Sequence, residues 1–332
     1  MFGLRIGPCL IAMLLPLAAH ASEMDRYTYI AADFTAADQG GDIVPAVVKA
    51  QVLLDRANIS SGEIDGKYSP RLEEAIKAFA EIHNMPADTR WSAAFWDVLT
   101  TPAIVPVLTD YTITSDDLKG PFLQLPARLE DMTPFKSLGY VGVREALAEK
   151  FHMSPELLAQ LNPDATFSVA GEEITVANVL TDPGSPSVAR IEVDKDRQTV
   201  KAYSNKGELI AFFPASVGSE EKPTPSGTLK VTSVNSDPSF HYNPNYRFKE
   251  IETRKPFELA PGPNNPLGST WIALSKPSYG IHGTAEPSMV GQAASHGCVR
   301  LTNWDAQRLS NILSRGVPVS FIEKPDSRFV AY

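Results

Sequence analysis

Apolar residues recur at helical spacing between positions 42 and 100, and this pattern predicts three short helices. An Asp65-Gly66 turn separates the first two helices. Ser69 followed by Pro70 is typical of a helix N-cap with proline at the first helical position, and predicts where the second helix begins. We therefore expect a small helical domain over residues 42–100.

In residues 108–180 the spacing of apolar residues changes along the segment from strand-like to helical and back to strand-like. Alternating residues at 111–114 indicate a strand, and periodic stretches at 143–151 and 154–162 indicate two helices. The second helix stops where a proline follows, because proline disfavours helix in the residue before it. Residues 171–176 close the segment as a strand. We expect an α+β module with the order strand, helix, helix, strand.

Beyond a loop of turn-forming residues at 181–186, the apolar period becomes two. Short strands separated by Gly, Pro and Asn are typical of an all-β body, which we expect as a sandwich-like domain over residues 186–325. One helix interrupts it: Thr302 and Asp305 resemble a capping box, and the helix is expected to run to Gly316. The fold class is thus a multidomain chain whose mainly-β domain follows a three-helix domain and an α+β module.

The composition agrees with such a multidomain chain. Its 332 residues suggest two or three domains, and 43% hydrophobic with 21% charged residues is ordinary for globular proteins. The formal net charge of −9 argues against nucleic acid as a main partner, because phosphate binding requires a basic surface.

The first 21 residues are expected to be a signal peptide. Arg5 supplies a positive charge, Pro8–Ala19 is an apolar run too short to span a bilayer comfortably, and Ala19-His20-Ala21 is a small-x-small cleavage signal. We expect a mature chain that begins near Ser22, is exported to the periplasm or cell envelope, and has no stable membrane span. An uncleaved membrane anchor is the alternative.

Cys298 is the candidate reactive residue. The only other cysteine, Cys9, lies in the expected signal peptide, so export leaves Cys298 without a disulfide partner in the chain. A thiol becomes nucleophilic when a base or cation stands nearby, and His282 and His296 are both close in sequence. Either histidine can be the base, and a buried inert cysteine is the alternative to a reactive thiol.

Several sequence blocks resemble the catalytic domain of the L,D-transpeptidases, the YkuD fold. The first blocks are Ile281-His282-Gly283-Thr284 and the stretch Ala294–Leu301, which contains Ser-His-Gly-Cys-Val-Arg. Further blocks match in the same order at Thr224–Gly227, Asn265–Gly268 and Asn303–Leu309. The resemblance spans about residues 188–323.

This resemblance implies a reaction and its residues. Members of the family attack the peptide bond between the diamino acid and the terminal D-alanine of a tetrapeptide stem in peptidoglycan, form a cysteine thioester, and pass the acyl group to an amine. Cys298 would be the nucleophile and His282 the base, with the Gly283 carbonyl orienting the imidazole. The N–H groups of Gly297 and Cys298 would form the oxyanion hole.

Three further residues receive roles from the same motif. Arg300 would hold a stem carboxylate through a charge-assisted contact. His296, with Ser295, would support the loop or the substrate. In extended backbone His296 shares a face with Cys298, so it remains the alternative base.

A zinc site is the chemical rival to this assignment. It would take four side chains, those of His241, His282, His296 and Cys298. No close-spaced ligand pair of a known type is present, and His241 is expected to line the cleft. We expect no metal and no cofactor.

The two N-terminal segments resemble wall-binding modules. Residues 42–100 resemble the small peptidoglycan-binding domain, although Tyr68-Ser69-Pro70 stands where a Phe-Gly pair is common. Residues 108–180 resemble a LysM module, which also ends its second helix in Leu-Asn-Pro. A spacer that binds no glycan is the alternative for the first segment, and an unclassified connecting domain for the second.

The leading hypothesis is an exported peptidoglycan L,D-transpeptidase that carbapenem-type inhibitors would acylate. The acceptor stays open: a second stem peptide gives a 3-3 cross-link, a protein lysine gives an anchored lipoprotein, and water makes the protein an L,D-carboxypeptidase. The alternative from another class is a non-catalytic peptidoglycan-binding scaffold.

Overall fold

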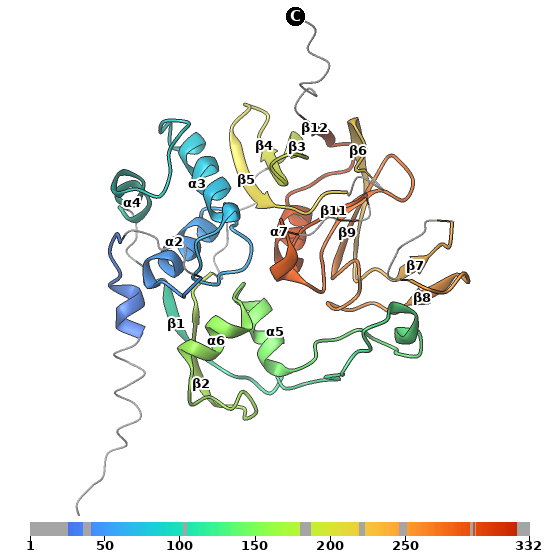
Figure 1. Ribbon diagram of the computed structural model, residues 1–332, viewed down its shortest axis with the longest axis horizontal. Coiled ribbons are helices and arrows are strands. Elements are labelled where there is room, and N and C mark those ends of the chain that lie inside the picture. The colour runs from blue at the N-terminus through green and yellow to red at the C-terminus, as the bar shows by residue number, and fades with distance from the viewer. Residues whose placement is uncertain are drawn as a thin grey trace, which may run out of the picture.

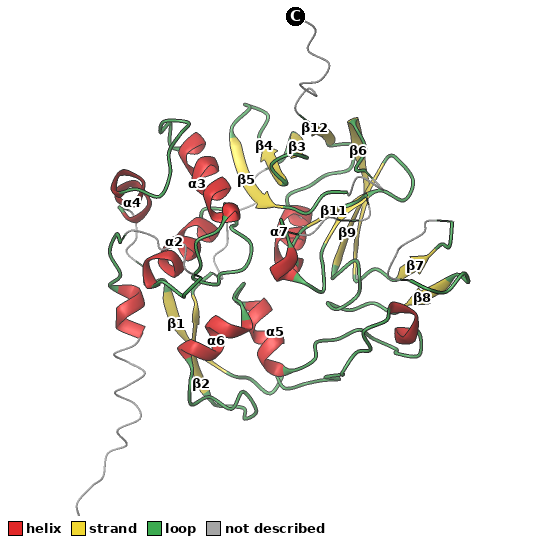
Figure 2. Cartoon of the chain, viewed as in Figure 1, coloured by secondary structure: helices red, strands yellow, loops and turns green. Residues whose placement is uncertain are grey.

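The computed structural model describes residues 26–35, 41–101, 105–179, 187–218, 223–245, 251–292, 295 and 297–323. Most helices belong to the N-terminal half and most strands to the C-terminal half (Figure 1, Figure 2). The expected signal peptide, residues 1–21, lies outside the described residues. No helix among the described residues has the length and apolar character needed to cross a bilayer.

The N-terminal domain contains the three predicted helices, α2 (Pro45–Arg56), α3 (Pro70–Ile82) and α4 (Ala93–Thr100). Ser69 caps α3 as predicted, because its hydroxyl accepts a hydrogen bond of 3.3 Å from the N–H of Leu72. Ser92 caps α4 in the same way, through the N–H of Phe95. The helical reading of this segment is confirmed.

The next segment has the predicted order of elements, β1 (Leu108–Thr112), α5 (Val143–Lys150), α6 (Pro155–Leu161) and β2 (Glu173–Ala177). The two strands pair antiparallel, with Leu108 opposite Ala177. β1 begins three residues earlier than predicted, since Leu108 is itself buried and paired. A short 3-10 helix, η1 (Leu129–Met132), lies in the connection to α5. The likeness to a LysM module stays a prediction.

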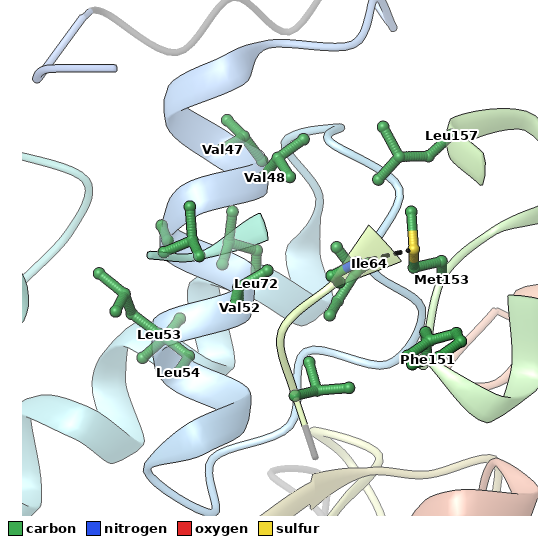
Figure 3. Packing of buried hydrophobic residues seen from close by; sticks show 14 of the residues in the cluster. Val47, Val48, Val52, Leu53, Leu54, Ile64, Leu72, Phe151, Met153 and Leu157 are labelled. Carbon is green, nitrogen blue, oxygen red and sulfur yellow. Dashed lines mark hydrogen bonds between the residues drawn. The ribbon is translucent and has the colours of Figure 1, made fainter. Parts of the chain in front are cut away.

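These two N-terminal parts share one hydrophobic core. Ile64, from the loop between α2 and α3, packs with the helix residues of its own domain and with Met153 and Phe151 of the next (Figure 3). The N–H of Ala177 donates a hydrogen bond to the Met153 sulfur at 3.2 Å. The backbone joins them as well, because Ile64 exchanges hydrogen bonds with His152 and Ser154. The two predicted modules are therefore packed as one unit.

Eight strands form one mixed sheet in the order β11-β10-β9-β6-β12-β3-β4-β5. They are β3 (Arg190–Asp194), β4 (Thr199–Tyr203), β5 (Leu209–Pro214), β6 (Gly227–Ser236), β9 (Thr270–Leu274), β10 (Gly280–His282), β11 (Val299–Arg300) and β12 (Pro318–Ile322). β6 pairs with β12 through its first half and with β9 through its second, and its register shifts between Val231 and Ser233. The sandwich-like body predicted is thus a single curled sheet.

The shortest strands contain too few residues for an alternation of apolar and polar positions to be recognised in the sequence. β10 and β11 contain three and two residues. β7 (Phe240–Tyr242) and β8 (Phe257–Leu259) form a separate two-stranded ribbon. Alternation needs at least four residues to be recognised, so these strands escape prediction.

Helix α7 (Asn303–Asn311) lies directly after β11. Thr302 caps it as predicted, with its hydroxyl accepting the N–H of Asp305 at 3.2 Å. The helix ends five residues before Gly316, so its predicted end is wrong: a turn follows Asn311. The second half of the capping box is also missing, because the Asp305 carboxylate instead accepts a hydrogen bond of 2.7 Å from the Ser60 hydroxyl.

The N-terminal domain covers the free edge of the sheet at β5. The N–H of Ser60 donates to the Phe212 carbonyl at 2.9 Å, and the N–H of Phe212 donates to the Asn58 carbonyl at 2.9 Å. An uncovered edge strand offers unpaired backbone groups to other chains. The docked loop pairs with these backbone groups and holds the helical domain against the eight-stranded sheet.

Candidate active site

His282 ends strand β10, which is paired on both sides. It lies opposite Trp271 of β9 and opposite Arg300 of β11. Its Nδ1 lies 2.6 Å from the Gly283 carbonyl oxygen. A carbonyl can only accept a hydrogen bond, so Nδ1 carries the proton. The neutral imidazole then presents an unprotonated Nε2, which is the form a general base requires.

The surroundings of His282 favour that neutral form. The residue is 5% exposed, and the indole of Trp271 stacks on its ring with centroids 5.6 Å apart. Burial, followed by the positive charge of Arg300, lowers the pKa of His282 to about 3, and the hydrogen bond to Gly283 only partly opposes this. The imidazole is therefore uncharged at neutral pH.

Cys298 immediately precedes β11, which runs parallel to β10. The register sets Ile281 beside Val299 and His282 beside Arg300. His282 and Arg300, as paired residues, face the same side of the sheet, and Cys298 lies in the bend that leads into β11. The thiol is partly exposed and lies 3.7 Å from the Ser278 carbonyl oxygen. The structure thus brings the segments that carry Cys298 and His282 together on neighbouring strands.

The turn before Cys298 depends on Gly297. This buried glycine has a φ of 98°, in the left-handed region that other residues rarely adopt. The Ser295 hydroxyl donates a hydrogen bond to the Cys298 carbonyl, which closes the turn. The N–H of Ser295 donates to the Val217 carbonyl at 2.7 Å. His296 lies outside the described residues.

Arg300 is held by its backbone to a neighbouring segment. Its N–H donates to the Ser216 carbonyl at 2.9 Å, and its carbonyl accepts from the Ser216 N–H at 2.8 Å. Its side chain is half-buried and close enough to His282 for its charge to disfavour the imidazolium. A cation at this position also suits an anionic ligand group beside the thiol.

Asn303, the first residue of α7, holds the loop that follows His282. Its side-chain oxygen accepts hydrogen bonds from the N–H groups of Thr284, at 3.1 Å, and Ser269, at 3.0 Å. The contact is close: a Cβ added at Gly283 would lie 2.1 Å from this oxygen. Asn303 therefore fixes the backbone whose carbonyl orients the imidazole.

The same asparagine connects the loop to the α+β module. Its amide donates a hydrogen bond of 2.9 Å to the Glu149 carboxylate on α5. Tyr140 donates to the same oxygen at 3.0 Å. Burial raises the pKa of Glu149 to about 7 in spite of both donors. Glu149 of the α+β module thus holds Asn303, which in turn holds the His282 loop of the candidate active site.

Sequence patterns pointed to the candidate reactive residues but not to the residues that hold them in place. Trp271, Asn303 and Glu149 lacked assigned roles; only the position of Asn303 in a family block pointed to it. His241 lies on β7 with its side chain 70% exposed, 3.7 Å from the Glu258 carboxylate, so it belongs to the ribbon. Among the described residues, no three His, Cys, Asp or Glu side chains are grouped to hold a metal ion.

Two segments of the chain match known protein families. Residues 188–320 match the YkuD family, described as "L,D-transpeptidase catalytic domain", and residues 44–99 match the "Putative peptidoglycan binding domain". A Bacillus licheniformis protein, "Putative L,D-transpeptidase YkuD", is 30% identical over 178 residues, covering 53% of this chain and 91% of that protein. The Escherichia coli "Probable L,D-transpeptidase ErfK/SrfK" is 25% identical, covering 54% and 59%. A solved L,D-transpeptidase from Mycobacterium smegmatis is 20% identical, with coverage of 47% and 64% and a TM-score of 0.34.

These similarities define the class as cysteine-dependent transpeptidases, which are acyltransferases. The chain belongs to the YkuD family of L,D-transpeptidases, as its sequence blocks predicted, and carries a peptidoglycan-binding domain at its N-terminal side. Both matched domains are related to peptidoglycan, which agrees with a protein of the cell envelope.

Proposed function

We propose that this chain is an exported L,D-transpeptidase that uses Cys298 as nucleophile and His282 as general base on peptidoglycan stem peptides. The observation that supports it best is the parallel pairing of β10 with β11, which brings the segments of Cys298 and His282 together while the Gly283 carbonyl orients the imidazole. Export rests on the predicted signal peptide at residues 1–21, and the substrate class rests on the family.

The first half-reaction makes a thioester. Nε2 of His282 takes the thiol proton, and the Cys298 sulfur attacks the carbonyl carbon between the diamino acid and D-alanine. The electron pair of the C=O bond moves to oxygen, where the N–H groups of Gly297 and Cys298 stabilise it. Collapse breaks the C–N bond, and His282 returns the proton to the departing amine of D-alanine.

The second half-reaction passes the acyl group to an acceptor. His282 takes a proton from the incoming amine, which attacks the thioester carbonyl, and the proton then returns to the Cys298 sulfur. A stem peptide as acceptor forms a 3-3 cross-link, and a protein lysine forms an anchored lipoprotein. Arg300 binds the stem carboxylate, and Ser295 and His296 shape the loop beside it.

The decisive experiment measures acylation of the thiol. The mature chain is incubated with a carbapenem, and intact mass is expected to show one adduct, located on Cys298. The variants Cys298→Ala and His282→Ala should form no adduct, or form it at least 100-fold more slowly, whereas His241→Ala, which alters an exposed histidine outside the site, should react at the wild-type rate. An adduct that survives in Cys298→Ala would refute the assignment.

Product analysis separates the transferase from the hydrolase that uses the same thioester. Tetrapeptide muropeptides are incubated with the chain, and products are identified by mass: joined stems support the transferase, and tripeptides alone support an L,D-carboxypeptidase. Peptidoglycan pull-down with Cys298→Ala tests the N-terminal domain separately. A scaffold role would require binding in the wild-type chain without either product.

A further inference from the structure

A cleft of about 440 Å³ lies where the three parts of the chain meet. Glu63 lines it from the N-terminal domain, and α5 and α6 line it from the α+β module. The catalytic domain contributes Trp304 of α7 and the segment 285–289, which contains the 3-10 helix η2 (Pro287–Met289) and follows the His282 loop. The cleft is distinct from the Cys298 face but shares this loop with it.

The lining of the cleft combines acidic groups with apolar walls. Its acidic residues are Glu63, Glu145, Glu149, Glu156 and Glu286. None of the described residues that line it is basic. Met153, Met289 and Trp304 supply apolar surface between these carboxyl groups. Such a lining suits a cationic group carried on an aliphatic arm.

Glu63 lacks the partner that its burial calls for. It is 5% exposed, and no residue in the described part of the chain donates a hydrogen bond to its carboxylate. The backbone holds it there, because the N–H of Ile64 donates to the His152 carbonyl at 2.8 Å. The Glu63 carboxylate lines the cleft, so a donor group bound there can reach it.

The charges of the cleft agree with an incoming cation. Burial raises the pKa of Glu63 to about 7, although the nearby charge of Arg71 opposes it. The guanidinium of Arg71 donates to the carbonyls of Ser288 and Val290 at 3.0 Å each, so these hydrogen bonds go to backbone and not to Glu63. An ammonium group would supply hydrogen-bond donors to Glu63 and would add its positive charge to that of Arg71.

We propose that this acidic cleft binds the side-chain ammonium of a stem-peptide diamino acid, at a site separate from the thiol. The ammonium donates to the Glu63 carboxylate at the cleft wall, and the methylene arm packs on Met289 and Trp304. No three carboxylates among the described residues are grouped for a metal ion, which leaves an organic cation as the better occupant. The choice of a stem peptide rests on the proposed function.

The test compares two muropeptide probes that differ only in charge. One tetrapeptide muropeptide keeps the free diamino acid amine, and the other has this amine acetylated. Binding is measured by titration calorimetry at pH 8 on Cys298→Ala, so that the probe is not consumed. The free-amine probe is expected to bind at least fivefold more tightly than the acetylated probe.

Variants locate this preference in the cleft. Glu156→Gln changes an exposed carboxylate at the cleft, and Glu63→Gln changes the buried one; each, combined with Cys298→Ala, should reduce the preference at least threefold. Glu173→Gln, at an exposed glutamate of β2 outside the cleft, should retain it. Equal affinity for both probes, or a preference that both cleft variants keep, would overturn the proposal.

Failure of this inference can be told apart from failure of the proposed function. Carbapenem acylation of Cys298 in the wild-type chain needs no diamino acid and reports only on the thiol. A normal adduct together with no amine preference refutes the cleft alone. A missing adduct refutes the catalytic assignment, whatever the calorimetry shows.

Discussion

Asp55 on α2 and Arg308 on α7 are 253 positions apart in the chain, yet the Arg308 guanidinium donates a hydrogen bond of 2.9 Å to the Asp55 carboxylate. The second carboxylate oxygen lies 3.1 Å from Nδ1 of His152, whose ring stacks on Trp304. Burial alone would raise the pKa of Asp55, but the charges of His152 and Arg308 outweigh it and hold this pKa well below its ordinary value. One buried carboxylate therefore joins the helical domain, the α+β module and the catalytic domain.

Removing this carboxylate should destabilise the whole chain. Asp55→Ala leaves Arg308 buried without its partner, and breaking a buried ion pair from one side costs about 3–5 kcal/mol. The loss is measured as the free energy of unfolding in denaturant at pH 7. Asp97→Ala, at an exposed aspartate of α4, is the matched control and should change it by less than about 0.5 kcal/mol. Similar losses of unfolding free energy in the two variants would show that the buried ion pair contributes no more to stability than an exposed carboxylate.

Asp305 lies in the same junction. Its raised pKa should make the free energy of unfolding decrease as pH rises, whereas the lowered pKa of Asp55 acts in the opposite direction. Burial raises the pKa of Asp305 from 3.8 to about 6. The folded state then holds the proton more tightly than the unfolded state, so this group stabilises the fold below pH 3.8 and loses that contribution as pH rises to about 6. Asp305→Asn cannot ionise, and we expect it to gain about 1–3 kcal/mol over the wild type between pH 4 and pH 7.5.

Denaturant unfolding at the two pH values measures this gain. Asp97→Asn serves as the control for removal of an exposed carboxylate and should show no such change. A difference between Asp305→Asn and the wild type that is the same at pH 4 and pH 7.5 would mean that Asp305 is already ionised in the folded chain at the lower pH.

These junction residues also show where prediction from sequence stops. Periodicity predicted α2, α3 and the order β1-α5-α6-β2, because each depends on local spacing and capping. The pairing of Asp55 with Arg308 depends on how the domains pack, so no local sequence pattern predicts it. Within the site, the His-Gly and Ser-His-Gly-Cys blocks pointed to Cys298 and His282, whereas Glu149 acts from another module and carries no motif.

Asn303 should be a positioning residue for the histidine. Asn303→Ala removes the acceptor that fixes the Thr284 and Ser269 N–H groups, so the Gly283 carbonyl loses its fixed place. We expect the rate of Cys298 acylation by a carbapenem to fall about 10- to 100-fold, which corresponds to 1.4–2.7 kcal/mol. Gln307→Ala, at an exposed position of the same helix, should react normally.

A positioning role differs from a structural one in how Asn303→Asp behaves. The aspartate keeps an oxygen for both N–H groups but loses the donor to Glu149. It should recover at least part of the acylation rate, although it places two carboxyl groups together. Equal rates for the alanine and aspartate variants, with normal unfolding of both, would exclude the oxygen as the important group.

The acylation rate should fall on acidification only at a pH well below the ordinary histidine pKa. This acidic decline is called the acid limb of the pH profile. His282 has its pKa lowered to about 3, so it stays neutral and able to accept the thiol proton as pH falls from 7.5 to 5. The pH profile of carbapenem acylation should show no decline centred near 6.5. Arg300→Gln removes a charge that disfavours the imidazolium and should shift the acid limb to higher pH. A limb near 6.5 in the wild-type chain would show that His282 is not held neutral.

Gly297 should be needed for its backbone conformation at the nucleophile. Alanine at a φ of 98° costs about 1–2 kcal/mol, or the turn changes and moves the Cys298 N–H away from the developing oxyanion. Gly316 offers a matched control, with a φ of 93° and no atom within 4 Å of an added Cβ, at a turn outside the site. Gly297→Ala and Gly316→Ala should lose similar unfolding free energy, but only Gly297→Ala should lose at least 100-fold in acylation rate. Equal acylation by the two variants would remove Gly297 from the oxyanion hole.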